Sequence, residues 1–290
     1  MNSGTKFMLN HKRFNLLMTL ILFSAFNLSG QMPSMVKSPL ISEKKDTTEI
    51  AFSDTVRKVQ NKAFGPGEYF RFDVNYGFVT AGEATLYVRD TIYNNRHCRL
   101  VEFNLNSKPF FDAFYKVRDR YITIIDADGL FPWRFEQHIR EGGFSRDFTA
   151  EFDQINHTAL TTNGKYPIPA YVQDMMSAFY YTRTLDFSKS KPGDKLHLQN
   201  FYKDSTYELD VKYKGIQTID VEAGKFNCII VEPLAREGGL FKNEGKLYIW
   251  MTNDERKMPV LVTAKILIGK VESELIEYRG LTGPLKSKLP

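Results

Sequence analysis

Residues 67–89 read GEYFRFDVNYGFVTAGEATLYVR, and this stretch decides the fold class. Apolar and polar side chains alternate from Phe70 to Tyr76, and a period of two predicts a strand with one buried face. The same alternation resumes over Glu83–Arg89, after the small pair Ala81-Gly82. The stretch therefore predicts two strands, with the chain turning at Ala81-Gly82.

The rest of the chain repeats this pattern. Strands are predicted at 98–105, 120–126, 132–141, 145–153, 157–162, 195–202, 206–213, 218–222, 226–232, 246–252, 260–267 and 271–278. Most connections are short and rich in Gly, Asn or Asp, which favours antiparallel neighbours over crossover helices. These are more strands than we expect in the folded protein, so some predicted strands should merge into one and others should not form.

Helices are predicted over two segments, residues 110–117 and 172–184. In the second, Met175, Phe179 and Thr182 recur at helical spacing. Asp174 is placed to cap the first turn, and Arg183 lies in the last turn, where the helix dipole favours a cation. A flat sheet of this size would curl, split or close. The predicted fold is mainly β: a large curled antiparallel sheet, a half-barrel or open barrel, with one main helix packed in its concave face.

The N-terminus has the composition of an export signal. Basic residues precede the mostly apolar run Phe14–Leu28, which ends in Ser29-Gly30. This order predicts a signal peptide over residues 1–30, with an N-terminal membrane anchor as the alternative. Gln31 stands where a lipoprotein needs the cysteine that carries the lipid, so the protein is predicted not to be a lipoprotein.

Four segments follow from these patterns. They are the signal peptide 1–30, an irregular tether 31–63, a single β-rich domain 64–280 and a C-terminal tail 281–290. Residues 1–30 hold three basic and no acidic residues, so the remaining 260 carry a net charge of +2 rather than +5. With no cluster of Lys or Arg, this near-neutral chain argues against a nucleic-acid partner. No transmembrane span is expected after export.

The sequence contains no recognisable catalytic or metal-binding motif. His97, His138, His157 and His197 lie in four different strand regions, without metal-ligand spacing, so we expect neither a metal nor a cofactor. Nucleophile-elbow and phosphate-loop patterns are missing, so no catalytic residue is assigned and a non-enzymatic protein is expected. Cys98 and Cys228 either pair in an oxidising compartment or remain buried thiols, and the sequence leaves both possibilities open.

The aromatic content carries the strongest hint of function. After residue 30 the chain holds 36 aromatic residues in 260, which either fill a large core or surround a ligand cavity. In the second case the ligand-binding residues are predicted to be Met175, Met176, Phe179 and Tyr180 from the helix, with Trp133 and Phe135 from a strand.

Four landmarks, in order along residues 64–279, carry a family resemblance. They are Gly67-Glu68-Tyr69 with Ala81–Ala84, then Asp174–Arg183, Gly224–Cys228 and Ile249–Val260. Together they resemble the exported domain of unknown function 3108 family. The family motif implies structural roles for Asp174, Arg183, Trp250, Asp254, Arg256 and Pro259, and implies no activity.

The last landmark also resembles the periplasmic lipoprotein carriers (LolA/LolB-like). Trp250 ends a strand, a turn with Asp254 follows, and Pro259 opens the next strand. That resemblance implies an unclosed antiparallel barrel that holds acyl chains.

The sequence is compatible with three functions. The leading hypothesis is an exported, non-enzymatic binding protein of the cell envelope that holds a lipid or other apolar ligand in a β half-barrel. It would be periplasmic, soluble or peripherally associated with the outer membrane. The alternative is a structural or assembly partner of an outer-membrane protein complex, and the third is an envelope hydrolase.

Overall fold

The computed structural model describes residues 56–235, 247–265 and 269–290. The predicted signal peptide and most of the predicted tether lie outside them. The first strands are β1 (Tyr69–Tyr76), β2 (Val79–Tyr93), β3 (Arg96–Ser107), β4 (Arg118–Asp126), β5 (Pro132–Glu141), β6 (Phe144–Asp153), β7 (Thr158–Thr161) and β8 (Gly164–Pro167). After helix α3 come β9 (Lys195–Tyr202), β10 (Ser205–Val221), β11 (Gly224–Ala235), β12 (Leu247–Thr252), β13 (Pro259–Lys265), β14 (Lys270–Arg279) and β15 (Lys288–Leu289).

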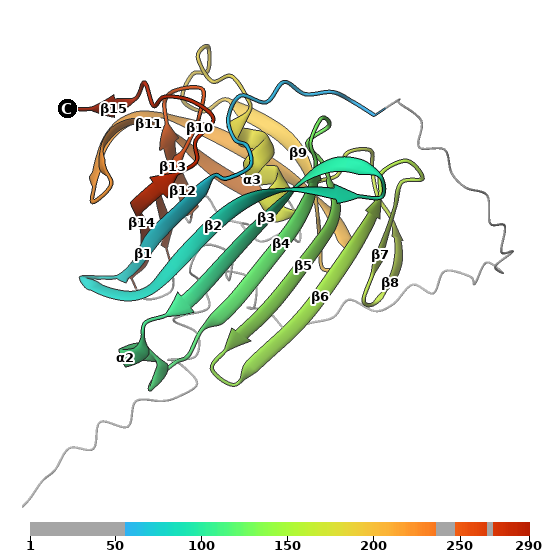
Figure 1. Cartoon of the computed structure of the whole chain (residues 1–290), viewed down its shortest axis with the longest axis horizontal. Coiled ribbons are helices and arrows are strands. Elements are labelled where there is room, and N and C mark those ends of the chain that lie inside the picture. Colours follow the sequence, from blue (N-terminus) through green and yellow to red (C-terminus); the bar gives the residue numbers. More distant parts are fainter. Residues whose placement is uncertain (1–55, 236–246, 266–268) are drawn as a thin grey trace, which may run out of the picture.

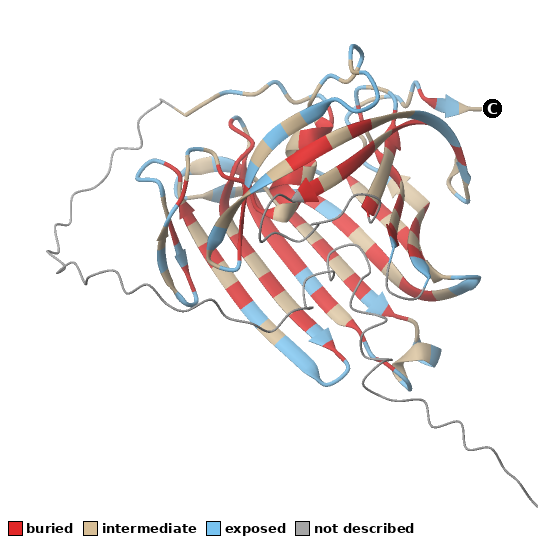
Figure 2. Cartoon of the chain, turned by 180° about the vertical axis from the view of Figure 1, so that it is seen from behind, coloured by how far each residue is buried: buried red, intermediate tan, exposed pale blue. Residues whose placement is uncertain are grey.

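All of these strands belong to one antiparallel sheet. Its order is β8-β7-β6-β5-β4-β3-β2-β1-β14-β13-β12-β11-β10-β9, and β15 pairs with β11. The two predicted strands at 206–213 and 218–222 are a single strand, β10, with a bulge between Tyr213 and Gly215. The mainly β prediction is confirmed, and the strand alternation appears in Figure 2 as bands of buried and less buried residues.

The expectation that the chain turns at Ala81-Gly82 is wrong. The turn between β1 and β2 is Gly77-Phe78, where Gly77 has a φ of 62°, and Ala81-Gly82 lies inside β2. Gly82 is needed for another reason. A Cβ atom there would lie 2.8 Å from the backbone oxygen of Asn106, so the glycine allows β3 to approach β2 closely.

This close approach predicts that Gly82→Ala pushes β3 away from β2. We expect a loss of about 1–3 kcal/mol in the free energy of unfolding, measured by urea denaturation. Gly143→Ala is the matched control, because a Cβ there meets no atom within 4 Å. Equal losses in both variants would contradict the packing explanation.

Helix α3 (Met175–Arg183) confirms the stronger of the two predicted helices. It lies inside the curl of the sheet, against β4 and β9 (Figure 1). Its buried side chains Met176 and Tyr180 join one core cluster with residues from β1 to β6 and from β9, β11, β13 and β14. The weaker predicted helix is only the four-residue α2 (Pro109–Asp112), which precedes β4.

The two ends of the sheet meet through side chains. In the described residues no ladder joins β8 to β9, so the sheet stays open. Across this gap the Thr161 hydroxyl and the Asn163 amide each donate a hydrogen bond to Asp204, both at 2.7 Å. Phe152 packs edge-on against Phe201, with ring centroids 5.6 Å apart. The curl thus brings the edges together without pairing their backbones.

Both segments that the sequence separates from the domain contact it. Arg57 lies over the ring of Tyr171 and donates hydrogen bonds to two carbonyl oxygens beside β5. At the other end, β15 pairs with β11, and the Ser287 carbonyl accepts a hydrogen bond from the Asn227 backbone. Cys98 and Cys228 are both buried free thiols.

Candidate functional site

The C-terminal end of α3 is fixed by a fully buried ion pair. Arg183 and Glu68 have no exposed side-chain surface, and two guanidinium nitrogens each donate to one Glu68 oxygen at 2.7 Å. Burial lowers the pKa of Arg183, but the Glu68 carboxylate outweighs it, and the net shift is upward. Burial also raises the pKa of Glu68, which Arg183 opposes. The charge on Glu68 therefore depends on Arg183.

Arg183 also joins segments that are far apart in the sequence. It donates to the carbonyl oxygens of Ala63, Arg256 and Lys257, at 3.3, 3.1 and 3.1 Å. Its guanidinium lies 5.5 Å from the ring centre of Phe70 in β1. Three of the four sequence landmarks thus meet at one side chain, and the predicted structural role of Arg183 rests on these contacts.

Asp174 fixes the other end of α3. Its carboxylate accepts hydrogen bonds from the backbone N–H groups of Met176 and Ser177, at 2.7 and 2.9 Å, in a capping box. The Thr123 hydroxyl of β4 donates to its second oxygen at 2.6 Å. Burial raises the pKa of Asp174 to about 6, against the hydrogen bonds that lower it. The helix is therefore attached to the sheet at both ends.

Asp254 lies in the turn between β12 and β13 and is bonded to three groups. Asp254 accepts hydrogen bonds from the Thr252 hydroxyl, at 3.0 Å, and from the Arg256 and Ser287 backbones, at 2.9 and 3.0 Å. Pro259 is the first residue of β13. The indole N–H of Trp250 donates to Gln217 at 3.0 Å. These contacts are structural, and they place the carbonyl groups that Arg183 binds.

The predicted ligand-binding residues divide into two groups. Met176, Tyr180 and Phe135 are buried in the main core, and Met175 and Phe179 pack against it with part of their surface exposed. Trp133 belongs to a different cluster and donates its indole N–H to Asp126 at 3.1 Å. Their role in ligand binding stays a prediction, and five of the six stabilise the fold around α3.

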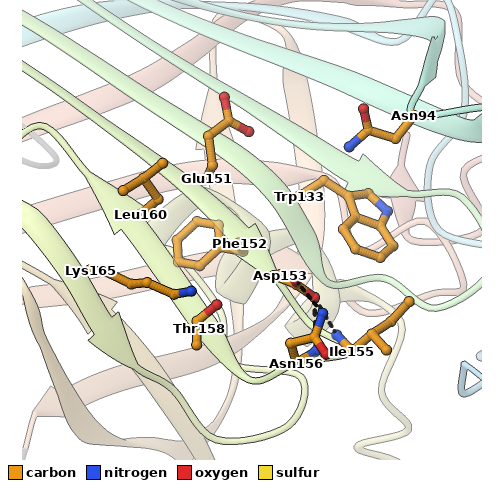
Figure 3. A pocket seen from close by; sticks show the side chains of 10 residues that line it. All are labelled: Asn94, Trp133, Glu151, Phe152, Asp153, Ile155, Asn156, Thr158, Leu160 and Lys165. Carbon is orange, nitrogen blue, oxygen red and sulfur yellow. Dashed lines mark hydrogen bonds between the residues drawn. The ribbon is translucent and has the colours of Figure 1, made fainter. Parts of the chain in front are cut away.

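Trp133 borders a cavity of about 330 Å³ near the turn between β6 and β7 (Figure 3). Its carboxylates are engaged in local structure. Asp153 accepts hydrogen bonds from the Asn156 side chain and from two turn N–H groups, and Glu151 pairs with Arg134 and Tyr93. The two carboxylates that line the cavity are therefore already bonded within the protein, and the other polar lining residues include Asn94, Thr158 and Lys165.

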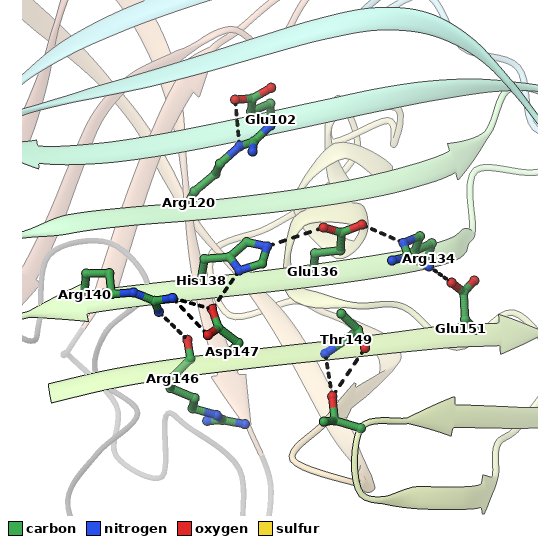
Figure 4. Close-up of polar contacts among 11 residues, drawn as sticks. Glu102, Arg120, Arg134, Glu136, His138, Arg140, Arg146, Asp147, Thr149 and Glu151 are labelled. Carbon is green, nitrogen blue, oxygen red and sulfur yellow. Dashed lines mark hydrogen bonds and ion pairs between the residues drawn. The ribbon is translucent and has the colours of Figure 1, made fainter.

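The outward side chains of β3 to β6 form a ladder of opposite charges (Figure 4). Arg120 pairs with Glu102 at 3.0 Å, and Arg140 pairs with Asp147 at 2.9 Å. His138 lies between Glu136 and Asp147, at 3.4 and 2.8 Å. Exposed pairs of this kind contribute at most about 1 kcal/mol each and are typical of a solvent-facing sheet. In the described part of the chain, no three His, Cys, Asp or Glu side chains are grouped to hold a metal.

Exposed phenylalanines gather at one end of the sheet instead. Phe78 in the β1–β2 turn is fully exposed, and Phe110, Phe114 and Phe144 are 72%, 64% and 43% exposed. Phe110 packs against Phe114 with ring centroids 5.7 Å apart. Because β1 to β6 are antiparallel neighbours, the β1–β2, β3–β4 and β5–β6 connections lie side by side at the same end of these strands (Figure 1). We name residues 77–78, 108–117 and 142–144 the phenylalanine edge.

This exposure is unusual for the residue type. Burying a phenylalanine is worth roughly 1.5–3 kcal/mol, so four exposed rings forgo a large part of the available stabilisation. All exposed phenylalanines among the described residues lie on this edge. The other exposed large hydrophobic side chains, apart from Val79, are Tyr87, Ile92, Ile155, Leu160 and Ile216 on other elements. Exposed aromatic side chains that are grouped at one end of a sheet are typical of interaction surfaces.

A pair of buried carboxyl groups lies just inside the phenylalanine edge. Asp119 at the start of β4 accepts a hydrogen bond from the Arg140 backbone at 2.9 Å, and its carboxyl contacts that of Glu141. Both residues are buried. Burial raises the pKa of Asp119. The hydrogen bond from the Arg140 backbone and the contact with Glu141 oppose this rise in the pKa of Asp119.

Two features of the site are not predicted from the sequence. Glu68 lies in the first landmark, but nothing in the pattern identifies it as the partner of Arg183. The phenylalanine edge does have a signal in the sequence, which is an aromatic residue beside a turn glycine, where polar residues are usual. Phe78 follows Gly77, and Phe144 follows Gly142-Gly143.

Comparison with known proteins settles the family. The profile of a protein family of unknown function, DUF3108, matches residues 71–276. The chain belongs to the DUF3108 family. The match confirms the resemblance that the sequence landmarks carry. The description of the DUF3108 family gives no function.

Solved structures resemble the DUF3108 chain only distantly. A β-barrel-like DUF1849 protein from Brucella abortus is 10% identical, with 77% of this chain and 98% of that chain covered and a TM-score of 0.47. A Bacteroides fragilis protein with a YmcC-like fold is 12% identical, with 78% and 100% covered and a TM-score of 0.34. No curated protein matches the chain. Among the described residues, no helix is long and apolar enough to cross a membrane.

Proposed function

We propose that this DUF3108 protein is an exported, non-enzymatic binding protein of the cell envelope. It takes up a lipid or another apolar component at the phenylalanine edge. The observation that carries the proposal is the exposure of Phe78, Phe110, Phe114 and Phe144 on neighbouring turns, outside a core that is filled without them.

The chemistry of the edge supports an apolar ligand. Aromatic rings offer large contact areas to acyl chains at a small entropic cost, since each has only two side-chain torsions. Met175 and Phe179 keep part of their surface exposed and remain candidates for deeper contacts. A binding role is favoured over hydrolysis because the contacting carboxyl groups of Asp119 and Glu141 are buried in the fold.

Native mass spectrometry of the protein purified from its own envelope tests the proposal. We expect an acyl-bearing species bound to each chain, and its loss in a Phe110→Ser/Phe114→Ser variant. Ile92→Ser is the matched control, because Ile92 is 68% exposed and lies at the opposite end of β2. The control should keep the bound species.

Two results would count against this function. Folded protein that repeatedly carries no apolar species would overturn it. A stoichiometric envelope protein bound in place of a lipid would instead support the structural or assembly role.

A further inference from the structure

Basic side chains accompany the phenylalanine edge. Lys108 and Lys116 flank the segment that carries Phe110 and Phe114, and Lys116 is exposed. Lys108 lies 3.5 Å from Asp73 and 3.7 Å from Glu83, so its charge is partly compensated within the protein. The exposed pair Phe110 and Phe114 therefore lies between two lysines in the chain.

A second pair of lysines extends the edge toward β13. Lys265 and Lys270 are the last register pair of β13 and β14, and both are exposed. β14 pairs with β1, so this pair lies beside the Gly77-Phe78 turn. Like charges directly opposite each other destabilise a strand pair, and Glu272, 2.9 Å from Lys270, offsets only part of this. Anionic groups outside the protein would complete the compensation.

The arrangement suits a flat surface better than an enclosed ligand. The rings lie at the tips of separate turns along an edge, with cations between and beside them. Aromatic side chains with adjacent lysines are typical of protein segments that lie at a bilayer surface, where rings enter the headgroup boundary and lysines meet phosphates.

We propose that the phenylalanine edge docks on a bilayer surface that contains anionic headgroups. The edge contributes Phe78, Phe110, Phe114 and Phe144 to the boundary of the acyl region. Lys108, Lys116, Lys265 and Lys270 face the headgroups. The inference rests on the proposed function and names the surface at which the apolar component is exchanged.

Vesicle flotation tests the inference with protein purified from its own envelope. We expect the protein to float with vesicles of phosphatidylethanolamine and phosphatidylglycerol, and to bind pure phosphatidylcholine vesicles more weakly. Binding to the anionic vesicles should fall as salt rises from low to physiological concentration, because exposed charges are then screened.

Variants of the phenylalanine edge, each with a control variant elsewhere on the surface, show whether vesicle binding depends on this edge or on surface substitution in general. Phe110→Ser/Phe114→Ser should lower partitioning at least about tenfold, while Ile92→Ser leaves it unchanged. Lys116→Glu/Lys270→Glu should weaken binding to anionic vesicles only. Lys225→Glu is the control for charge, because Lys225 is exposed beside the β10–β11 turn at the other end of the sheet. Circular dichroism verifies that each variant is folded.

The outcomes distinguish docking from ligand binding. Wild-type protein that fails to float with anionic vesicles overturns the docking proposal, and the proposed function survives if mass spectrometry still finds a bound lipid. Equal losses in the edge variants and their controls also overturn docking. Flotation that the edge variants abolish and the controls preserve supports it.

Discussion

Replacing Arg183 by methionine is expected to cost about 3–5 kcal/mol of unfolding free energy, the largest effect of any single substitution considered. Methionine keeps much of the volume but leaves Glu68 buried without its cation. Three backbone carbonyl groups also lose their donor. Urea denaturation measures the loss.

The pH dependence of that variant follows from Glu68. Without Arg183, burial raises the pKa of Glu68 further, opposed only by Tyr180 and Arg256, so the folded state holds a proton that the unfolded state releases at lower pH. Stability of Arg183→Met should therefore fall further as pH rises above the ordinary range of a glutamate.

Two further variants control the Arg183 prediction. Arg183→Met/Glu68→Met should be less destabilised than Arg183→Met alone, since no buried charge is left. Arg140→Met breaks an exposed pair with Asp147 and should cost less than about 1 kcal/mol. Similar losses for Arg183→Met and Arg140→Met would contradict the central place given to the buried pair.

Asp174→Asn is expected to stabilise the protein at neutral pH. The pKa of Asp174 is raised by burial to about 6, from an ordinary value of 3.8. Between these two values the folded state holds a proton that the unfolded state has released, so stability falls as pH rises from about 4 to about 6. A shift of about two units corresponds to about 3 kcal/mol. Asparagine keeps the helix cap and does not titrate.

The measurement is the free energy of unfolding at pH 4.5 and pH 7.5 in wild type and variants. The difference between wild type and Asp174→Asn should grow with pH in favour of the variant. Asp174→Ala lacks the cap and should lose about 0.5–2 kcal/mol relative to Asp174→Asn at both pH values. A constant difference between wild type and Asp174→Asn across this range would show that Asp174 does not hold a proton in the fold.

Alternation along the strands predicted most of the fold correctly. The strands at 132–141 and 195–202 coincide with β5 and β9, and α3 lies within the predicted helix. A period of two is a local property that burial on one face imposes on each strand separately. The turn prediction at Ala81-Gly82 is wrong because a glycine can mark either a turn or a close approach of two strands, and only the position of Asn106 distinguishes the two.

The candidate site was less predictable than the fold. The place of Arg183 in the last turn of α3 predicts a favourable interaction with the helix dipole, and the family resemblance implies a structural role, but neither identifies its partner, which lies 115 residues away in sequence. The register of the sheet brings Phe78, Phe110 and Phe144 to one edge, and no local pattern contains that register. Met176 and Tyr180 are buried in the core, and the sequence alone does not distinguish a core residue from a cavity residue, because both have the same apolar character.

A photoreactive phenylalanine analogue, placed in turn at Phe110 and at Ile92, tests the central claim most directly. Irradiation of the native envelope followed by mass spectrometry of the protein identifies what lies against each position. We predict acyl-chain adducts at position 110 and none at position 92. Equal lipid adducts at both positions, or only protein adducts at position 110, would contradict lipid binding at the phenylalanine edge.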